Sequence, residues 1–181
     1  LINNKITIDF SVIGFPKCAT TSIHKTLEGM TEIFMPDHEV QVPSLIHGEL
    51  RLPNNKSILG IKNPNIIYEP HNLLALFKSN KDMKFVISMR NPSDWLFSFY
   101  QYRMLEIRNQ KLWLKPYLIK HPEYNTITFD DIIYNNKSLI GVSIESGFFV
   151  DYLRDIFKWI PTDNILIMMM EEIAHDPRNA Y

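Results

Sequence analysis

Apolar residues occur along the chain in short runs that are separated by glycine, proline and small polar residues. Short apolar, β-branched runs between such turn signals predict buried β-strands. By this pattern we expect strands at 7–14, 57–61, 84–89 and 165–169. The first of these runs ends at a Gly-Phe-Pro sequence, which indicates a strand that leads directly into a turn.

Helical patterns fill the segments between these runs. In the first, Ile23, Leu27 and Met30 fall on one helix face, and Thr20 or Thr21 is the expected N-cap. Further helices are predicted at 72–79, 93–108 and 149–160. Strands that alternate with helices are typical of a mostly parallel sheet with helices on both faces. We therefore predict an α/β fold of three layers, and ligands of such sheets bind at the carboxyl ends of the strands.

The composition favours one globular domain over residues 1–181. Of the 181 residues, 45% are hydrophobic and 22% are charged, which is enough for one sizeable core. The net charge of -1 argues against a nucleic-acid-binding surface. Cys18 is the only cysteine, so no intrachain disulfide is expected, and the histidines lack the spacing of a metal site.

No apolar run approaches the roughly 20 residues that span a bilayer, and no signal-peptide pattern opens the chain. From this we expect a soluble protein without a membrane segment, in the cytoplasm rather than the secretory pathway. The first residue is Leu and a strand pattern begins almost at once, so loss of an N-terminal anchor stays open as an alternative.

The segment 14–22 joins the first predicted strand to the first predicted helix. Backbone N–H groups and the helix dipole make such a junction a site for phosphate. A nucleoside-triphosphate P-loop would place its lysine where Thr20 stands, whereas the cation here is Lys17, in the middle of the loop. The sequence thus predicts a P-loop-like anion site that is not that of a kinase.

This loop resembles the 5′-phosphosulfate loop of the sulfotransferase superfamily, P-K-x-G-T-T, at residues 16–21. The resemblance implies that the chain binds the sulfate donor 3′-phosphoadenosine 5′-phosphosulfate. It also implies that Lys17 contacts the oxygen between phosphate and sulfate. Alanine replaces the family's glycine at Ala19, which costs on the order of 1 kcal/mol if that position needs positive φ. The residues implied to hold the 5′-phosphate are Cys18, Ala19, Thr20, Thr21 and Ser22.

A second cluster follows the predicted strand at 84–89. Arg90 lies at the strand end and Ser98 lies in the next helix, for which Asn91 or Ser93 is the expected cap. The planar guanidinium suits phosphate, and a hydroxyl near a helix N-terminus adds a donor. The stretch resembles the family's R-x-P-x-D-x-x-x-S motif, which implies that Arg90 and Ser98 bind the 3′-phosphate.

Sulfuryl transfer needs a base for the acceptor's proton. Glu39, in the sequence Glu39-Val40-Gln41, resembles the base glutamate of the carbohydrate (heparan sulfate type) sulfotransferases, although Val42 and Pro43 replace the phenylalanines that usually follow. His38 is the rival base, because its ordinary pKa suits proton abstraction near neutral pH.

Lys62 resembles the lysine of the family's E-K-x-P stretch, which lies near the transferred sulfuryl group. A surface lysine before an Asn-Pro turn is the alternative interpretation.

The resemblance extends to Glu171, Asp176 and Pro177, which are similar to a later E-x-x-x-x-D-P segment. Family members usually continue past that segment, so we expect a domain that is truncated at its C-terminus. The implied activity is transfer of a sulfuryl group to a hydroxyl or amine, with a glycan or a small hydroxylated molecule as the favoured acceptor. A P-loop small-molecule kinase and an inactive nucleotide-binding module stay open as alternatives.

Overall fold

The computed structural model describes residues 7–41, 53 and 56–175. The chain divides into two compact units. The first consists of Leu1–Arg90 with Tyr152–Tyr181, and the second of Asn91–Asp151. The expectation of one domain over residues 1–181 stays a prediction. The Val42-Pro43 and Asp176-Pro177 positions of the sequence comparison lie outside the described residues.

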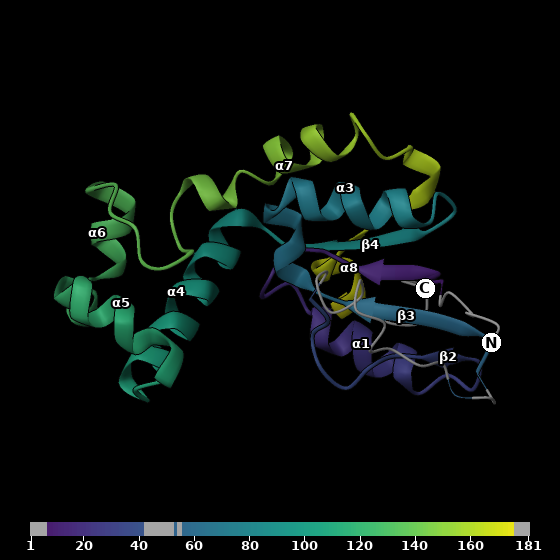
Figure 1. The fold of residues 1–181 in the computed structure, drawn as a ribbon. Helices are drawn as coiled ribbons and strands as arrows, with labels where there is room; N and C mark the ends of the chain where they lie inside the picture. Colours follow the sequence, from purple (N-terminus) through teal and green to yellow (C-terminus); the bar gives the residue numbers. More distant parts are fainter. Residues whose placement is uncertain (1–6, 42–52, 54–55, 176–181) are drawn as a thin grey trace. The chain divides into compact units, whose positions relative to one another are not determined.

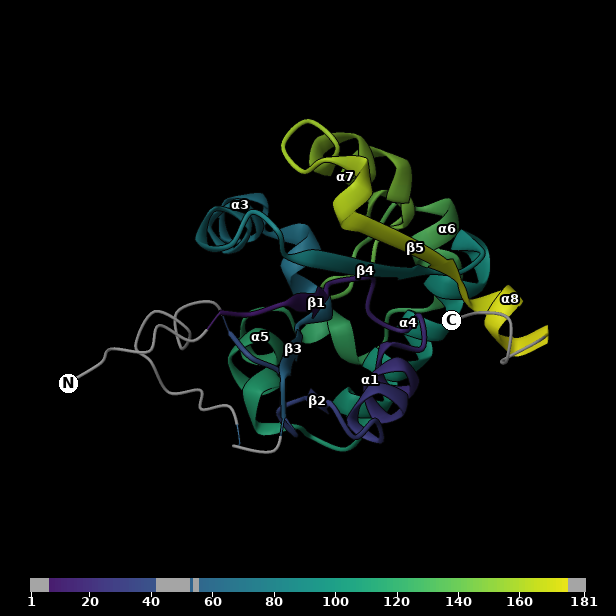
Figure 2. The same ribbon diagram turned by 90° about the vertical axis from the view of Figure 1, so that its right-hand side faces the viewer.

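The first unit contains a five-stranded sheet in the order β2-β3-β1-β4-β5, and Figure 2 labels all of these strands. All four strand pairs are parallel, which confirms the predicted α/β class with a mostly parallel central sheet. The strands are β1 (Phe10–Val12), β2 (Ile33–Phe34), β3 (Ile58–Lys62), β4 (Lys84–Met89) and β5 (Ile165–Met169).

Helices cover both faces of this sheet, with α1 (Thr20–Glu28) on one face and α3 (Pro70–Ser79) and α7 (Phe149–Ile156) on the other (Figures 1 and 2). Side chains alternate between the faces along each strand. On the α1 face, Val12 and Met168 pack against Ile23 and Met35. On the α3 face, the rings of Phe77 and Phe85 lie 6.2 Å apart. A short helix, α8 (Met170–His175), follows β5.

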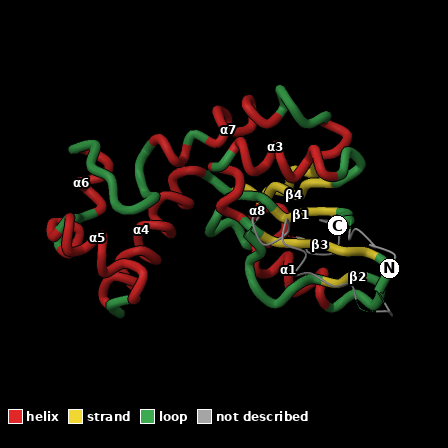
Figure 3. Tube along the Cα trace, viewed as in Figure 1, coloured by secondary structure: helices red, strands yellow, loops and turns green. Residues whose placement is uncertain are grey.

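The second unit is built from helices and loops (Figure 3). Its helices are α4 (Pro92–Arg108), α5 (Lys115–Lys120) and α6 (Phe129–Tyr134). The fully buried Trp95 packs edge-on against Phe99 and Phe149, with ring centroids 5.3 Å apart in both pairs. Short 3₁₀ turns connect the elements of both units: Pro64–Tyr68, Leu112–Leu114, Pro122–Asn125, Glu145–Gly147 and Thr162–Asn164.

The strands predicted at 84–89 and 165–169 are confirmed with their bounds, whereas the strand predicted at 7–14 pairs only over Phe10–Val12. Asn91 is the N-cap of α4, and its side chain accepts a hydrogen bond from the Ser93 amide at 2.9 Å. The placement of Met30 on one helix face with Ile23 and Leu27 was wrong. Gly29 ends α1, so Met30 lies beyond it and is exposed.

Gly14 marks the point where the chain leaves β1 and passes over β4. A Cβ atom at this position would lie 2.0 Å from the backbone nitrogen of Ser88. Only glycine allows the two backbones to approach this closely. The Phe15 amide then donates to the Ser88 carbonyl at 3.1 Å. The loop after β1 is therefore fixed against β4 from its first residue.

The expected caps Thr20 and Thr21 were wrong for α1, because Ala19 is the N-cap. Ala19 adopts the left-handed conformation, with φ 60° and ψ 16°, and makes no side-chain cap. A positive φ is the conformation in which alanine is strained and glycine is not.

We predict that Ala19→Gly raises the free energy of unfolding by about 1 kcal/mol, because glycine adopts positive φ without a Cβ clash. Urea denaturation followed by circular dichroism would measure the change. Ala75→Gly is the matched control, since Ala75 is an exposed residue inside α3. There glycine should lower stability by about 0.5–1 kcal/mol. Equal destabilisation at both positions would contradict the strain at Ala19.

Candidate functional site

The loop from Gly14 to Ser22 is held by buried side chains at its centre. Phe15 and Cys18 are fully buried, and the Cys18 amide donates to the Phe15 carbonyl at 3.2 Å. Between them Lys17 has φ 65° and is half-buried. Together with Ala19, Lys17 gives the loop two left-handed residues of non-glycine type. Such conformations turn successive amides inward, which is the geometry of anion-binding loops.

Three amides at the start of α1 point to anion binding. The Ser22 and Ile23 amides donate to the Ala19 carbonyl at 2.9 and 3.1 Å, which begins the helical pattern. Among the described residues, the amides of Ala19, Thr20 and Thr21 have no hydrogen-bond acceptor. Unpaired N–H groups at a helix N-terminus, with the helix dipole behind them, suit a phosphate.

Cys18 contributes to this loop as an anchor. Burial raises the pKa of its thiol to about 12, and the side chain lies against the backbone of Arg90. At neutral pH the sulfur is thus a neutral, buried group. Reactive cysteines need a thiolate and access to solvent, and Cys18 has neither. Its side chain therefore stabilises the loop by packing.

Arg90 follows the last residue of β4 and is half-buried. Its Nε is buried, and no acceptor bonds to it among the residues that the structure describes. A buried guanidinium N–H without an acceptor is costly, and an anionic ligand would satisfy it. Ser98 lies in α4 of the second unit, where it is also half-buried.

Lys62 and Glu39 form an ion pair in which Lys62 Nζ lies 3.3 Å from Glu39 Oε1. Lys62 is the last residue of β3 and only 8% exposed, so it is not a surface lysine. The Glu39 side chain is 41% exposed. Lys62 pairs in register with Val12, the last residue of β1, which places the ion pair beside the strand that leads into the loop.

His38 lies in the same segment but in a different environment. Its side chain is 70% exposed, and its Nδ1 lies 2.8 Å from an oxygen of Asp37. This hydrogen bond lowers the pKa of the Asp37 carboxyl. The ion pair with Lys62 thus involves Glu39, while His38 pairs with a solvent-exposed carboxylate.

The sheet brings three cations to one edge. Lys62, Lys17 and Arg90 lie at or just beyond the carboxyl ends of β3, β1 and β4, which are neighbours in the sheet. Because these strands are parallel, their carboxyl ends share one edge. The cations predicted from the sequence in the first unit thus all end or follow strands at the same edge of the sheet.

Asn63 is a residue of this edge that the sequence analysis missed. It is buried, and its side chain bonds to the segment that follows Glu39. The Asn-Pro sequence indicated only a turn, and an asparagine before proline carries no signal of a long-range contact.

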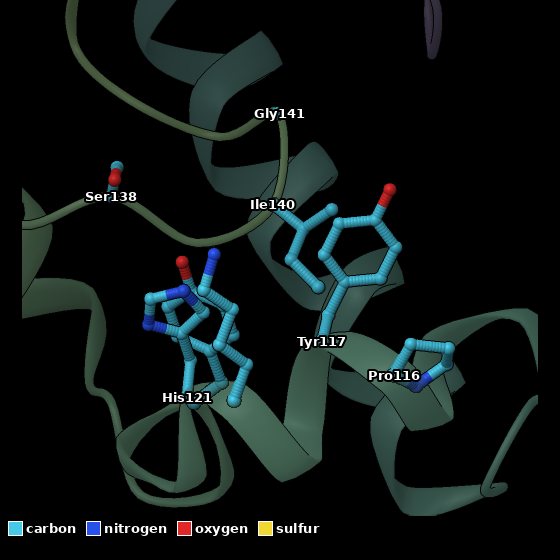
Figure 4. A pocket seen from close by; sticks show the side chains of 8 residues that line it. Pro116, Tyr117, His121, Ser138, Ile140 and Gly141 are labelled. Carbon is cyan, nitrogen blue, oxygen red and sulfur yellow. The ribbon is translucent and has the colours of Figure 1, made fainter.

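Each unit also contains a cavity, and none of the predicted site residues lines either of them. In the first unit a cavity of about 240 Å³ lies between the turn after β3, α3, α7 and the residues that follow α7, with Tyr68, Tyr152 and Trp159 among its walls. In the second unit a cavity of about 510 Å³ is lined by residues from α5 to Gly141 (Figure 4). There the His121 ring stacks on Tyr124, with centroids 5.0 Å apart.

The part of the chain that the structure describes offers neither a metal site nor a helix that could cross a membrane. No cluster of three or more His, Cys, Asp or Glu side chains could hold a metal ion there. None of the helices in that part of the chain is long and apolar enough to cross a bilayer.

Comparison with known proteins identifies the chain at family level. The fold is similar to that of a crystallised sulfotransferase from Alicyclobacillus acidocaldarius, with a TM-score of 0.67 and 16% identity over 95% of this chain and 76% of that chain. No curated protein matches the sequence. The match to the family described as "Sulfotransferase domain" runs over residues 7–180. Since that match spans nearly all of the sequence, the chain belongs to the sulfotransferase domain family.

Proposed function

We propose that the chain transfers a sulfuryl group from 3′-phosphoadenosine 5′-phosphosulfate to a hydroxyl or amine of an acceptor. The observation that carries the proposal is that Lys62, Lys17 and Arg90 end or follow β3, β1 and β4, which are neighbours in a parallel sheet. Three cations suit a donor with several anionic groups. Membership of the family supports sulfotransfer over the kinase alternative.

The donor's 5′-phosphate would lie on the loop after β1. The amides of Ala19, Thr20 and Thr21 would donate to it, since those of Cys18 and Ser22 already bond within the chain. The 3′-phosphate would bind Arg90, whose buried Nε needs an acceptor. The role that the sequence motif implies for Ser98 stays a prediction.

Glu39, Lys62 and Lys17 would carry the chemistry. Glu39 would accept the proton of the acceptor group while the new bond to sulfur forms. Lys17 would stabilise the negative charge on the bridging oxygen as its bond to sulfur breaks, leaving 3′-phosphoadenosine 5′-phosphate. Lys62 would orient the Glu39 carboxylate through their ion pair and add positive charge near the sulfuryl group.

A glycan or a similar hydroxylated molecule is the acceptor class that we propose. Its support is the resemblance of the Glu39 and Lys62 segments to those of the carbohydrate sulfotransferases. The ion pair between the two residues agrees with a shared role at one acceptor.

The donor site can be tested with nucleotides alone. A ligand that binds only the folded state raises stability by RT ln(1 + [L]/Kd), so thermal-shift titration ranks the nucleotides. We expect 3′-phosphoadenosine 5′-phosphate to stabilise the chain more than ADP or ATP does. Arg90→Ala should weaken it by about 10- to 100-fold, which corresponds to about 1.5–3 kcal/mol for a charged hydrogen bond, and should leave ADP binding nearly unchanged.

Arg108→Ala is the control for this prediction, because Arg108 is an exposed arginine at the end of α4. Equal loss of affinity for the bisphosphate and for ADP in Arg90→Ala would refute the 3′-phosphate assignment. Preference for ATP would favour the kinase alternative.

Lys17→Ala should lower turnover by about 10²–10³, the typical effect of removing one stabiliser of transition-state charge. Its effect on nucleotide affinity should be much smaller, because the charge is needed most when the bridging oxygen becomes anionic. Turnover would be measured with radiolabelled donor and a panel of hydroxylated and amino acceptors. Lys25→Ala, at an exposed position of α1, is the control. If only affinity falls, Lys17 is a ground-state binder.

Glu39→Gln should lower turnover by about 10²–10⁴ at nearly constant nucleotide affinity, because the amide keeps the shape of the side chain and cannot accept the proton. The same transfer assay measures it. His38→Ala should lower turnover much less, because His38 pairs with the exposed Asp37, whereas Glu39 forms the ion pair with Lys62. The reverse ranking would give the role of base to His38.

A further inference from the structure

Asn63 lies where β3 ends and the chain turns into the 3₁₀ segment Pro64–Tyr68. It is only 2% exposed. Its amide continues the pairing of the sheet by donating to the Val12 carbonyl at 3.0 Å. The backbone of Asn63 is thus fixed against the end of β1, the strand that leads into the loop from Gly14 to Ser22.

The Asn63 side chain uses its donors and its acceptor. Nδ2 donates to the Val40 carbonyl at 3.2 Å and to Gln41 Oε1 at 3.3 Å. Oδ1 accepts from the Asn65 amide at 3.2 Å. A side-chain amide has two donor hydrogens and one carbonyl oxygen, so each of these groups has a partner.

These bonds hold the segment that carries Glu39. Val40 is 2% exposed, and its amide donates to the Lys62 carbonyl at 3.1 Å while its own carbonyl accepts from Asn63. The backbone immediately after Glu39 is therefore clamped on both sides to the end of β3. Glu39 itself has an exposed side chain outside any helix or strand, and its ion pair is with the neighbouring Lys62.

From this we infer that Asn63 is a positioning residue for Glu39: its amide fixes the backbone from which the carboxylate reaches the acceptor. The inference rests on the role proposed for Glu39. Loss of the Asn63 side chain would leave the buried Val40 carbonyl without its donor, and the segment would shift to regain one. A displacement of about 1 Å at a reacting group can cost about 10²-fold in rate.

Asn63→Ala should lower turnover by about 10- to 100-fold and leave the affinity for 3′-phosphoadenosine 5′-phosphate within about twofold. The nucleotide is expected to bind the loop after β1 and Arg90, whereas the Asn63 side chain bonds to Val40, Gln41 and Asn65. Asn65→Ala is the matched control. Asn65 is an exposed asparagine two residues away, and its backbone amide, which alanine retains, makes the bond to Asn63.

Asn63→Asp distinguishes two roles of the side chain. The clamp is formed by the hydrogen bonds of Nδ2 to Val40 and Gln41, and the turn is held by the hydrogen bond of Oδ1 with the Asn65 amide. The aspartate keeps an oxygen for the Asn65 amide, and its carboxylate cannot donate to Val40. Loss of turnover in Asn63→Asp comparable to that in Asn63→Ala supports the clamp. Wild-type turnover in Asn63→Asp overturns it, because the turn alone would then be what Asn63 provides.

A double-mutant cycle gives the sharpest test. If Asn63 acts through Glu39, then Asn63→Ala should add almost nothing to the loss in Glu39→Gln. Additive losses overturn the inference, and so does a parallel fall of turnover and nucleotide affinity. If Asn63→Ala does not fold, the same cycle is run with Gln41→Ala, which removes one partner of the clamp at an exposed position. Unchanged turnover in Glu39→Gln alone would instead overturn the proposed base, and this inference with it.

Discussion

The parallel pairing of β1 with both β3 and β4 is the constraint on which the candidate site depends. β1 pairs over only three residues, yet it sets the register of both neighbours. Two glycines make the fit possible: Gly14 lets the chain cross the Ser88 backbone, and Gly60 leaves room for the ring of Phe10. A slip of β1 by one residue would turn Val12 to the opposite face of the sheet. The edge that carries the three cations exists because this register is fixed.

The loop after β1 combines backbone strain with a rigid anchor. Lys17 and Ala19 hold left-handed conformations that cost a non-glycine residue roughly 1–2 kcal/mol each. Phe15 and Cys18, both fully buried, offset this cost by packing. The neutral thiol of Cys18 suits this position, because a charged group there would have to be desolvated. Left-handed conformations of this kind turn successive amides inward.

The sequence predicted the fold through its most regular parts. The strands β4 and β5 could be predicted because they are apolar runs next to turn residues. By contrast, β2 has two residues and is too short to show a pattern. Ala19 was not expected to be the N-cap of α1, because alanine is a poor N-cap. The conformation of the loop, and not the residue type, sets where this helix begins. Lys62 and Glu39 were recognised singly by resemblance, while their ion pair and the contacts of Asn63 join segments more than twenty residues apart and needed coordinates.

The central claim is that this edge of the sheet carries out sulfuryl transfer. Its most direct test follows a radiolabelled sulfuryl group from 3′-phosphoadenosine 5′-phosphosulfate into a panel of glycan, alcohol and amine acceptors, with the nucleotide product measured in the same reaction. The account predicts labelled product and 3′-phosphoadenosine 5′-phosphate in equal amounts, both lost when Arg90 and Lys17 are replaced together. Tight binding of the nucleotide with no labelled product from any acceptor would contradict it and identify a nucleotide-binding module instead.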